Sequence, residues 1–214
     1  MSAKPTRILL FVAALALVMA PCLADAPQVP PNIRAPDAFR VELDTSRGPI
    51  TMEVTRANAP IGVDRFYNMV TSGYLKGARF FRVVPGFVVQ FGISGDPALN
   101  KLWDSPIKDD PYRPHNSNSR GAVVFARTSD PNSRTTQLFI NLANNRGLDS
   151  EGFIPIGRVT QGMVFVDGLF SGYGEDPDQG LIITQGDAYI MKSFPSLDYI
   201  KVARVVPLDN PVQK

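Results

Sequence analysis

The chain has 214 residues, of which 44% are hydrophobic and 20% charged, a balance typical of a globular protein with one sizeable core. It carries 22 basic and 20 acidic residues, so charge gives no reason to expect a nucleic acid or an anionic lipid surface as partner. A single cysteine and a single histidine exclude a disulfide framework and a zinc site built from several of these residues.

The N-terminal segment, residues 1–24, resembles a secretory signal peptide. Two basic residues precede an unbroken apolar run over residues 8–20, which is shorter than the ~20 residues needed to cross a bilayer core. We expect cleavage after Ala24, a periplasmic or secreted protein, and no stable membrane insertion afterwards. A mature chain without Cys22 has no cysteine, which suits an oxidising compartment. The alternatives are an uncleaved anchor and a lipoprotein attached at Cys22, the second disfavoured by the proline before it.

The rest of the chain divides into three parts. Residues 25–37 hold four prolines and little apolar periodicity, which predicts an extended linker or a disordered arm. One domain is expected over residues 38–207, because no internal repeat or change of composition indicates a boundary inside it. Residues 208–214 form a C-terminal tail.

The expected elements of the domain are short. Alternating apolar residues predict a hairpin over residues 39–54, and apolar residues at helical spacing predict a helix from Pro60, stopped at Gly73. Further strands are expected at 79–84, 87–91, 122–127, 137–141, 153–159 and 199–206, with a second helix at 161–170. This pattern predicts a mainly β fold, a closed eight-stranded antiparallel β-barrel capped by two α-helices. The polar stretches 92–120 and 171–196 are predicted to be long loops.

The usual catalytic and metal-binding signatures are missing from the sequence. His115 stands among turn-forming residues and is expected to be a solvated loop side chain. Trp103 and the acids Asp104, Asp109 and Asp110 are expected to anchor and solvate their loop. A calcium site made by these acids is the alternative, but they lack the Gly and Glu spacing of a calcium loop. We therefore expect no metal and no cofactor.

The most informative stretch surrounds Arg82, because an arginine inside an apolar strand is costly unless its charge has a partner or a task. Alternation along the strand would place Arg82 on the same side as Phe80 and Val84. After a tight turn, Phe87 and Gln90 could return beside it. Two interpretations follow: a guanidinium held over an aromatic floor, or a salt-bridged arginine in an edge strand.

A second stretch, FARTSDPNSRTTQLFIN over residues 125–141, places a polar loop between two strands. Together with FFRVVPGFVVQF over residues 80–91, it strongly resembles the cyclophilin-type peptidyl-prolyl cis–trans isomerases, and the bacterial secreted branch most closely. GFIPIG at 152–157 and PSLDYI at 195–200 are similar to later strands of that family. The resemblance covers about residues 38–206.

The resemblance implies an enzyme that accelerates rotation about X–Pro peptide bonds and assists the folding of exported proteins, with Arg82 as the catalytic arginine. Around Arg82 it implies a proline pocket lined by Phe87, Phe139 and Leu148, with a further apolar contact at Val88. The amide of Gln90 would hold the arginine and the substrate, and Gln137 would form a polar rim. The substrate backbone would pair with the protein backbone at Ala126 and Arg127. The expected partners are proline-containing peptides and unfolded client proteins, bound by a monomer.

The sequence departs from the family pattern at several positions. Val88 stands where many members have a longer apolar side chain. Leu138 stands where phenylalanine is usual, on the side expected to face the core. Gly147 stands where an aromatic residue, often tryptophan, flanks the site, so cyclosporin binding is expected to be weak. The alternatives to an enzyme are a non-catalytic, chaperone-like module that binds proline peptides, and a structural envelope protein with a vestigial barrel.

Overall fold

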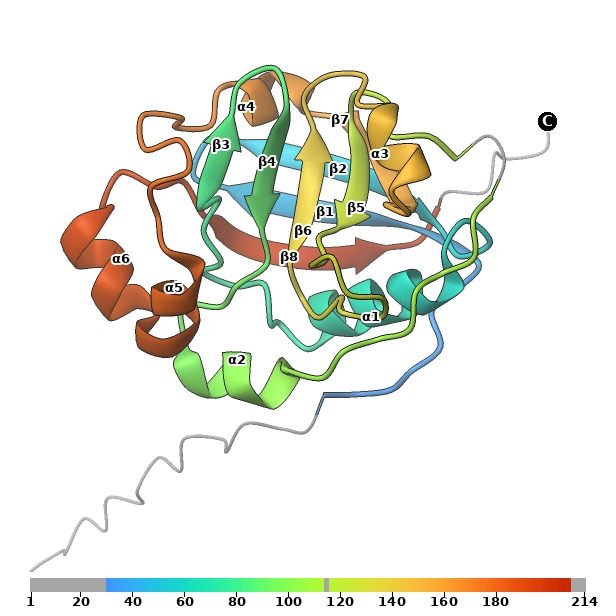
Figure 1. Cartoon of the computed structure of the whole chain (residues 1–214), viewed down its shortest axis with the longest axis horizontal. Helices are drawn as coiled ribbons and strands as arrows, with labels where there is room; N and C mark the ends of the chain where they lie inside the picture. The colour runs from blue at the N-terminus through green and yellow to red at the C-terminus, as the bar shows by residue number, and fades with distance from the viewer. Residues whose placement is uncertain (1–29, 114–115, 209–214) are drawn as a thin grey trace, which may run out of the picture.

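The computed structural model describes residues 30–113 and 116–208, which form eight strands and six helices (Figure 1). The strands are β1 (Ala38–Thr45), β2 (Pro49–Thr55), β3 (Arg82–Val84), β4 (Val88–Phe91), β5 (Ala122–Phe125), β6 (Leu138–Asn141), β7 (Pro155–Gln161) and β8 (Ile200–Val206). The helices are α1 (Pro60–Thr71), α2 (Pro97–Trp103), α3 (Gly147–Ser150), α4 (Met163–Asp167), α5 (Gln179–Gln185) and α6 (Asp187–Ser193). The predicted signal peptide, His115 and all of the tail but its first residue lie outside the described residues.

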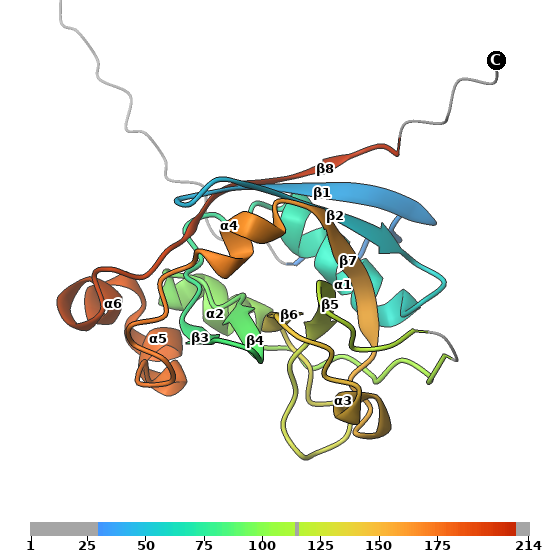
Figure 2. The same cartoon turned by 90° about the horizontal axis from the view of Figure 1, so that it is seen from above.

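All eight strands belong to one antiparallel sheet with the order β3-β4-β6-β5-β7-β2-β1-β8. Figure 2 shows this sheet end-on and strongly curled: β8, β1 and β2 form one wall, β3, β4, β6 and β5 form the facing wall, and β7 connects the two. The mainly β, eight-stranded antiparallel architecture predicted from the sequence is therefore confirmed.

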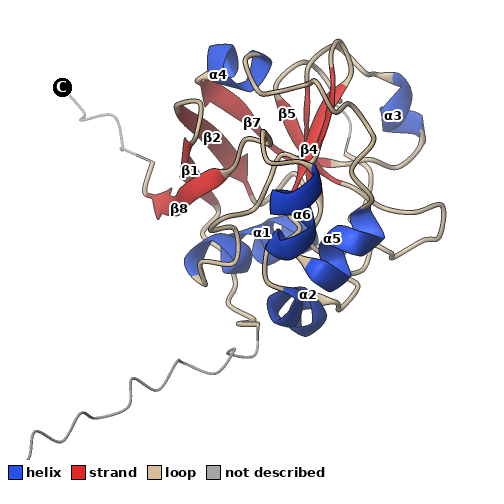
Figure 3. Ribbon diagram, turned by 90° about the vertical axis from the view of Figure 1, so that its left-hand side faces the viewer, coloured by secondary structure: helices blue, strands red, loops and turns tan. Residues whose placement is uncertain are grey.

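The prediction of a closed barrel is wrong. Strands β3 and β8 are the two edges of the sheet. The segments around their starts meet at an isolated bridge between Arg79 and Tyr199 and through the Gly77 amide, which donates to the Ile200 carbonyl at 2.8 Å, but β3 and β8 themselves do not pair. The edge of β3 is instead taken by a later segment, because the Val83 amide donates to the Gly174 carbonyl at 3.2 Å. The sheet is an open half-barrel, and α5 and α6 flank the open side (Figure 3).

Both predicted helices are present, as α1 and the short α4, but the structure contains four more. Helices α2, α5 and α6 lie in the stretches 92–120 and 171–196 that the sequence predicted to be loops. Each has only seven residues, too few to show a helical repeat of apolar side chains. Their starts are nevertheless capped in the ordinary way at α2 and α5, where Asp96 and Asp178 accept from backbone amides. Within the described ranges no helix has the length and apolar character to cross a membrane.

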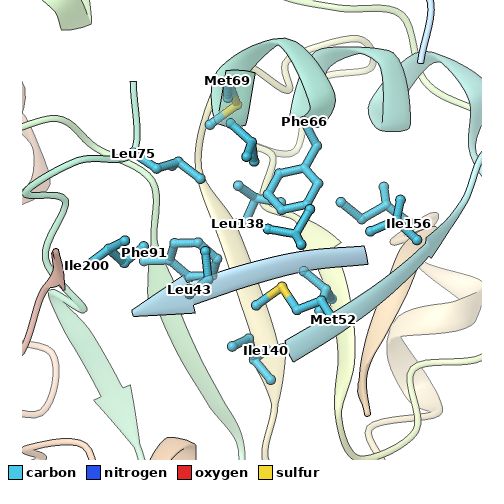
Figure 4. Close-up of a cluster of buried hydrophobic side chains, with 14 of the residues drawn as sticks. Leu43, Met52, Phe66, Met69, Leu75, Phe91, Leu138, Ile140, Ile156 and Ile200 are labelled. Atoms are coloured by element: carbon cyan, nitrogen blue, oxygen red, sulfur yellow. The ribbon is translucent and has the colours of Figure 1, made fainter. Parts of the chain in front are cut away.

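The core fills the inside of the curled sheet. The predicted hairpin alternates as expected, with Phe39, Val41 and Leu43 all at most 1% exposed. Helix α1 closes one end of the core through Phe66 and Met69, which are fully buried. Figure 4 shows these side chains meeting residues from the strands of both walls. Because one face of every strand is committed to this cluster, the sheet leaves its opposite face for other contacts.

The 92–120 stretch is fixed to the core by a buried ion pair. The Asp110 carboxylate accepts from the backbone amides of Ile61 and Gly62, at 2.8 and 2.9 Å, at the start of α1. Arg134 Nη1 donates to the same carboxylate at 2.9 Å, and both side chains are buried. An acid at a helix N-terminus satisfies amides that have no partner within the helix. The anchoring predicted for this acid is thereby confirmed.

The described part of the predicted linker, residues 30–37, is extended and docked on α1. Asn68 holds both backbone groups of Ile33, accepting from its amide at 3.0 Å and donating to its carbonyl at 2.8 Å. The amide of Ala35 donates to Asp64 at 2.9 Å. Burial by itself would raise the pKa of Asp64, but hydrogen bonds from Arg56 and the Ala35 amide outweigh it and hold this pKa below its ordinary value.

Candidate active site

A cavity of about 480 Å³ opens on the outer face of the wall formed by β3, β4, β6 and β5. All nine site residues predicted from the sequence line it: Arg82, Phe87, Val88, Gln90, Ala126, Arg127, Gln137, Phe139 and Leu148. The other lining residues are Thr128, Ser133, Thr135, Glu151, Phe153 and Gln179. Among the described residues, no group of three or more His, Cys, Asp or Glu side chains is arranged to hold a metal ion.

Strand pairing places the central residues of this pocket in one row. Arg82 on β3 lies opposite Gln90 on β4, and Gln90 lies opposite Phe139 on β6. Residues directly opposite each other in adjacent strands point to the same face of a sheet. A guanidinium and an amide from one hairpin therefore stand side by side with a phenyl ring from a strand much later in the sequence.

The floor of the pocket is apolar. Val88, Val124 and Phe139 are buried together in a cluster separate from the main core, and Phe87, Leu148 and Phe153 pack partly buried around it. The rings of Phe139 and Phe153 meet edge to face, with centroids 5.7 Å apart. An apolar recess with aromatic walls suits a small, flat hydrocarbon ring better than a charged or extended group.

A chain of polar contacts borders this floor. The guanidinium carbon of Arg82 lies 5.7 Å from the centroid of the Phe87 ring, and Arg82 Nη1 is 3.5 Å from Gln90 Oε1. Gln90 Nε2 donates to Gln137 Oε1 at 2.7 Å. Glu175 pairs with Arg82 from outside the pocket. Both interpretations of Arg82 thus hold: it is a salt-bridged residue of an edge strand and it faces the aromatic floor.

The opposite rim is built by Ala126 and Arg127. The Ala126 amide donates to the Gln137 carbonyl at 2.9 Å, so this donor is already used within the protein. Arg127 Nη2 donates to the Glu151 carbonyl at 2.5 Å, and its guanidinium carbon lies 5.5 Å from the centre of the Phe153 ring. The Arg127 side chain therefore holds the segment around α3 against the pocket.

The rim residue Leu148 belongs to α3, whose position depends on Asp149. Burial by itself would raise the pKa of Asp149, but hydrogen bonds from the Ser117 hydroxyl and from the backbone and side chain of Asn118 outweigh it and keep that pKa below its ordinary value. The ionised carboxylate ties α3 to the segment before β5, and so fixes one wall of the pocket.

Three sequence expectations near the pocket are resolved by the structure. Phe80 does not lie beneath Arg82: the strand begins only at Arg82, so alternation does not extend back to Phe80, which packs in the main core beside Phe91. Leu138 is fully buried on the core side, as predicted. Gly147 leaves open space, since a Cβ atom built there meets nothing within 4 Å.

Sequence reasoning missed the six other residues that line the cavity, Phe153 among them, and Glu175 outside it. Phe153 is the first residue of the strand predicted at 153–159, whereas β7 begins only at Pro155, and its place in the GFIPIG stretch was the available signal. Glu175 lies in a stretch predicted to be a loop, 93 residues from the arginine that it contacts. No pattern in the sequence connects these two side chains.

Comparison with known proteins decides the family. The family described as cyclophilin type peptidyl-prolyl cis-trans isomerase/CLD matches residues 40–185, more than half of the chain. This chain belongs to the cyclophilin family. Among its cyclophilin relatives, the peptidyl-prolyl cis-trans isomerase A of Dickeya dadantii is 36% identical over 141 residues, a match that covers 64% of this chain and 74% of the relative. A peptidyl-prolyl cis-trans isomerase of Acinetobacter baylyi is 36% identical over 131 residues, covering 59% and 69%.

Solved cyclophilin structures share the fold. A cyclophilin type isomerase from Cryptosporidium parvum superposes with a TM-score of 0.57 at 22% identity, covering 81% of this chain and 99% of that one. A cyclophilin from Hirschia baltica gives a TM-score of 0.58 at 19% identity, covering 85% and 77%. The fold, the family match and the nine residues gathered at one pocket agree with the resemblance found in the sequence.

Proposed function

We propose that this cyclophilin catalyses cis–trans isomerisation of X–Pro peptide bonds in unfolded polypeptides, with Arg82 as the catalytic residue. The observation that carries the proposal is the row of Arg82, Gln90 and Phe139 across three neighbouring strands. It puts a charged donor beside an apolar recess of the right chemistry for a proline ring. A Cryptosporidium parvum relative, 21% identical, was crystallised in the presence of the dipeptide Ala-Pro, which supports a proline peptide as ligand.

The reaction needs no covalent chemistry. Rotation about the amide must overcome a barrier of ~18–20 kcal/mol, because the planar ground state is stabilised by resonance. At the twisted transition state that resonance is lost, and the proline nitrogen recovers a lone pair. A donor that bonds this nitrogen only when it is twisted lowers the barrier, since catalysis requires stronger binding of the transition state than of the ground state.

Arg82 is suited to this task by its position. Its guanidinium is always charged, and a charge-assisted hydrogen bond in a site that excludes water is stronger than a neutral one. The planar guanidinium holds each of its N–H donors in a fixed direction, unlike the freely rotating ammonium of a lysine. Gln90, which contacts Arg82 Nη1 at 3.5 Å and Gln137 at 2.7 Å, would keep the donor and the substrate in register.

The apolar residues would hold one side of the bond while the other side turns. Burying about 100 Å² of ring surface against Phe87, Phe139 and Leu148 contributes about 2.5 kcal/mol of binding. Phe153, which meets Phe139 edge to face, would stiffen this grip. Fixing the ring lets the rest of the peptide rotate without losing its place.

The test is a coupled isomerisation assay with a proline tetrapeptide. We expect Arg82→Ala to lower kcat/KM by about 10²- to 10³-fold, and Arg82→Lys to recover only part of it. The melting temperature should stay close to that of the wild type, because Arg82 pairs with the largely exposed Glu175 and exposed pairs add little stability. Unchanged turnover in Arg82→Ala contradicts the mechanism.

The second candidate is a non-catalytic module that binds proline peptides. The observation in its favour is the open space at Gly147, where the family often has an aromatic residue, because a looser pocket could bind a proline without gripping it. Fluorescence polarisation with a labelled peptide separates the two functions. Binding without acceleration of isomerisation favours the module, and neither binding nor acceleration favours a structural role.

We further propose that the protein assists folding of exported chains in the periplasm or outside the cell. The support is the N-terminal segment, with its basic start and its apolar run over residues 8–20. The test is the mass of the mature protein together with cell fractionation. We expect a mature chain starting at Asp25 in the exported fraction; a full-length chain in the cytoplasm contradicts this proposal and leaves the isomerase activity untouched.

A further inference from the structure

The segment 171–196 reaches the proposed catalytic arginine. The Gly174 carbonyl accepts from the Val83 amide at 3.2 Å, one residue after Arg82 on β3. The next residue, Glu175, then meets Arg82: Glu175 Oε1 lies 2.6 Å from Nε and 2.5 Å from Nη2. Figure 1 shows this segment, between α4 and α5, running beside β3. A backbone hydrogen bond and a charged pair thus fix the segment 171–196, called the insertion below, to the strand that carries Arg82.

The insertion is ordered by a small core of its own. Phe81 and Ile93 of the main body are buried together with Ile182 of α5 and Ile190 of α6. Aromatic rings from before and after Glu175 in the sequence meet edge to face, with centroids 4.9 Å apart for Phe170–Tyr173 and 5.0 Å for Tyr173–Phe194. Glu175 is therefore presented by a packed element, whose position does not depend on the ion pair alone.

The geometry divides the guanidinium into two sides. Glu175 takes the side formed by Nε and Nη2. The third nitrogen, Nη1, lies 3.5 Å from Oε1 of Gln90, which lines the pocket as Arg82 does. Glu175, which does not line the pocket, therefore engages Nε and Nη2, and Nη1 is the nitrogen on the side of the pocket residue Gln90.

From this we propose that Glu175 is a positioning residue, which holds Arg82 in the orientation that isomerisation requires. The inference rests on the proposed function of Arg82. Arginine has many rotamers, and β3 is an edge strand of three residues, so the strand by itself does little to restrict the side chain. A donor fixed before the substrate arrives loses less freedom in the transition state.

Stability is a poor explanation for the pair. The Glu175 side chain is 63% exposed and that of Arg82 23% exposed. Ion pairs with this exposure stabilise a fold little, because water screens them and two long side chains lose freedom. Removing Glu175 should therefore change the orientation of Arg82 while leaving the fold intact, which makes catalysis a clean measure of its role.

The experiment compares Glu175→Ala and Glu175→Gln with the wild type in the full mature chain, using the coupled isomerisation assay. We expect kcat to fall about tenfold in Glu175→Ala with KM changed by less than about twofold, since a misplaced catalytic group costs rate more than binding. The kcat of Glu175→Gln should lie between those of the wild type and Glu175→Ala, because the new amide oxygen can still accept from Nε of Arg82. The matched control is Glu42→Ala, which removes another exposed pair, Arg204 Nε to Glu42 Oε2 at 2.8 Å, away from the pocket.

Two further measurements test whether Glu175 acts through Arg82. In an Arg82→Ala background, adding Glu175→Ala should lower the rate no further, because two residues that work as one unit are not additive. In ¹⁵N NMR, the Nε–H signal absent from Arg82→Ala should be protected from exchange in the wild type and lose that protection in Glu175→Ala.

The outcomes separate the two proposals. A kcat in Glu175→Ala equal to or above the wild type, while Arg82→Ala is impaired, overturns the positioning role and leaves the isomerase mechanism standing. An additional loss in the Arg82→Ala background also overturns it, since Glu175 would then act on the substrate directly. Full activity of Arg82→Ala contradicts the catalytic role of Arg82, on which the positioning role rests. An unprotected Nε–H in the wild type overturns the positioning role without reference to activity.

Discussion

Adjacent residues on β4 and β6 face opposite sides of the sheet, one side lining the pocket and the other packing the core. On β4, Gln90 faces the pocket and contacts Arg82, whereas Phe91 packs fully buried against Phe80 in the core. On β6, Leu138 belongs to the core and Phe139 to the pocket floor. One sheet therefore packs the core with one face and lines the pocket with the other, and a shift of a single residue exchanges the two.

The two faces differ in what they tolerate. The inner face is filled by aliphatic and aromatic side chains from both walls (Figure 4), so any loss of volume there leaves a cavity. The outer face of the β3–β5 wall keeps a cavity of about 480 Å³ and a row of polar groups. Substitutions on the inner face should therefore act on folding, and those on the outer face on catalysis.

The largest expected effect is that of Phe91→Ala, on the inner face. It should lower the free energy of unfolding by about 4 kcal/mol, because it leaves a large cavity in a packed core. Its neighbour provides the control: Gln90→Ala should cost about 1 kcal/mol or less while lowering kcat/KM about tenfold. Urea unfolding and the isomerisation assay measure the two quantities. Equal stability losses in the two variants contradict the division between faces.

Asp110→Ala tests the buried ion pair with Arg134 and the contact with the start of α1, which covers the core. It leaves the buried charge of Arg134 short of a partner and two α1 amides without an acceptor. We expect a loss of about 3 kcal/mol in the free energy of unfolding and an unchanged kcat for the folded fraction. As a control, Asp44→Ala removes an exposed pair with Lys201 and should lower the free energy of unfolding by less than about 0.5 kcal/mol. An equally small loss in Asp110→Ala would contradict a stabilising role of the buried pair.

The variant Asp198→Asn tests how the contacts of Asp198 make the stability of the fold depend on pH. Burial by itself would raise the pKa of Asp198, but hydrogen bonds from Ser46, Arg47 and the Phe170 amide outweigh it and hold the pKa below its ordinary value. Because the pKa is lower in the folded state, the ionised carboxylate stabilises the fold at every pH above the unfolded pKa of about 3.9. This stabilisation is lost as pH falls through the folded-state pKa.

We therefore expect Asp198→Asn to destabilise the protein by about 2 kcal/mol at neutral pH. The difference from the wild type should shrink as pH falls below about 4, towards the lowered folded-state pKa. Urea midpoints measured from pH 7 to pH 3 follow this convergence. A difference between the two proteins that stays constant over this range would show that the ionised carboxylate is not the stabilising group.

The smallest expected effect is a gain on the outer face. Gly147→Trp adds an aromatic side chain where a Cβ atom meets open space. We expect cyclosporin to bind about tenfold more tightly, as one added aromatic contact is worth about 1.4 kcal/mol, with turnover of a short peptide changed by less than about twofold. Gly147→Ala is the control, and calorimetry the measurement. Equal affinity in all three proteins would show that the missing aromatic does not limit binding.

The sequence predicted what regular periodicity can encode. The alternation of Phe39, Val41 and Leu43 specified the hairpin, and the spacing of apolar residues after Pro60 specified α1. The nine pocket residues followed from the family resemblance, and they do line one cavity. These features depend on local pattern or on long motifs, both of which are visible in a single chain.

The features that the sequence did not reveal depend on contacts between distant segments. Whether β3 and β8 pair depends on what else occupies the edge of β3, and that is Gly174. Helices α5 and α6 are separated by Gly186 at φ 57° and are too short to show a period. Glu175 meets Arg82 across 93 residues of sequence, where the backbone of Gly174 bonds to β3 and the segment 171–196 packs against Phe81 and Ile93.

The non-sequential strand order has a consequence for how this enzyme becomes active. Strand β4 pairs with β6, and β5 pairs with both β6 and β7. The groups at positions 82 and 90 meet within one hairpin, but Phe139 joins them only after a long stretch of chain has been brought together. Such non-local pairing is slow and comes with the cooperative formation of the whole sheet. A partly folded chain therefore has no assembled pocket, and isomerase activity should appear only together with the completed sheet.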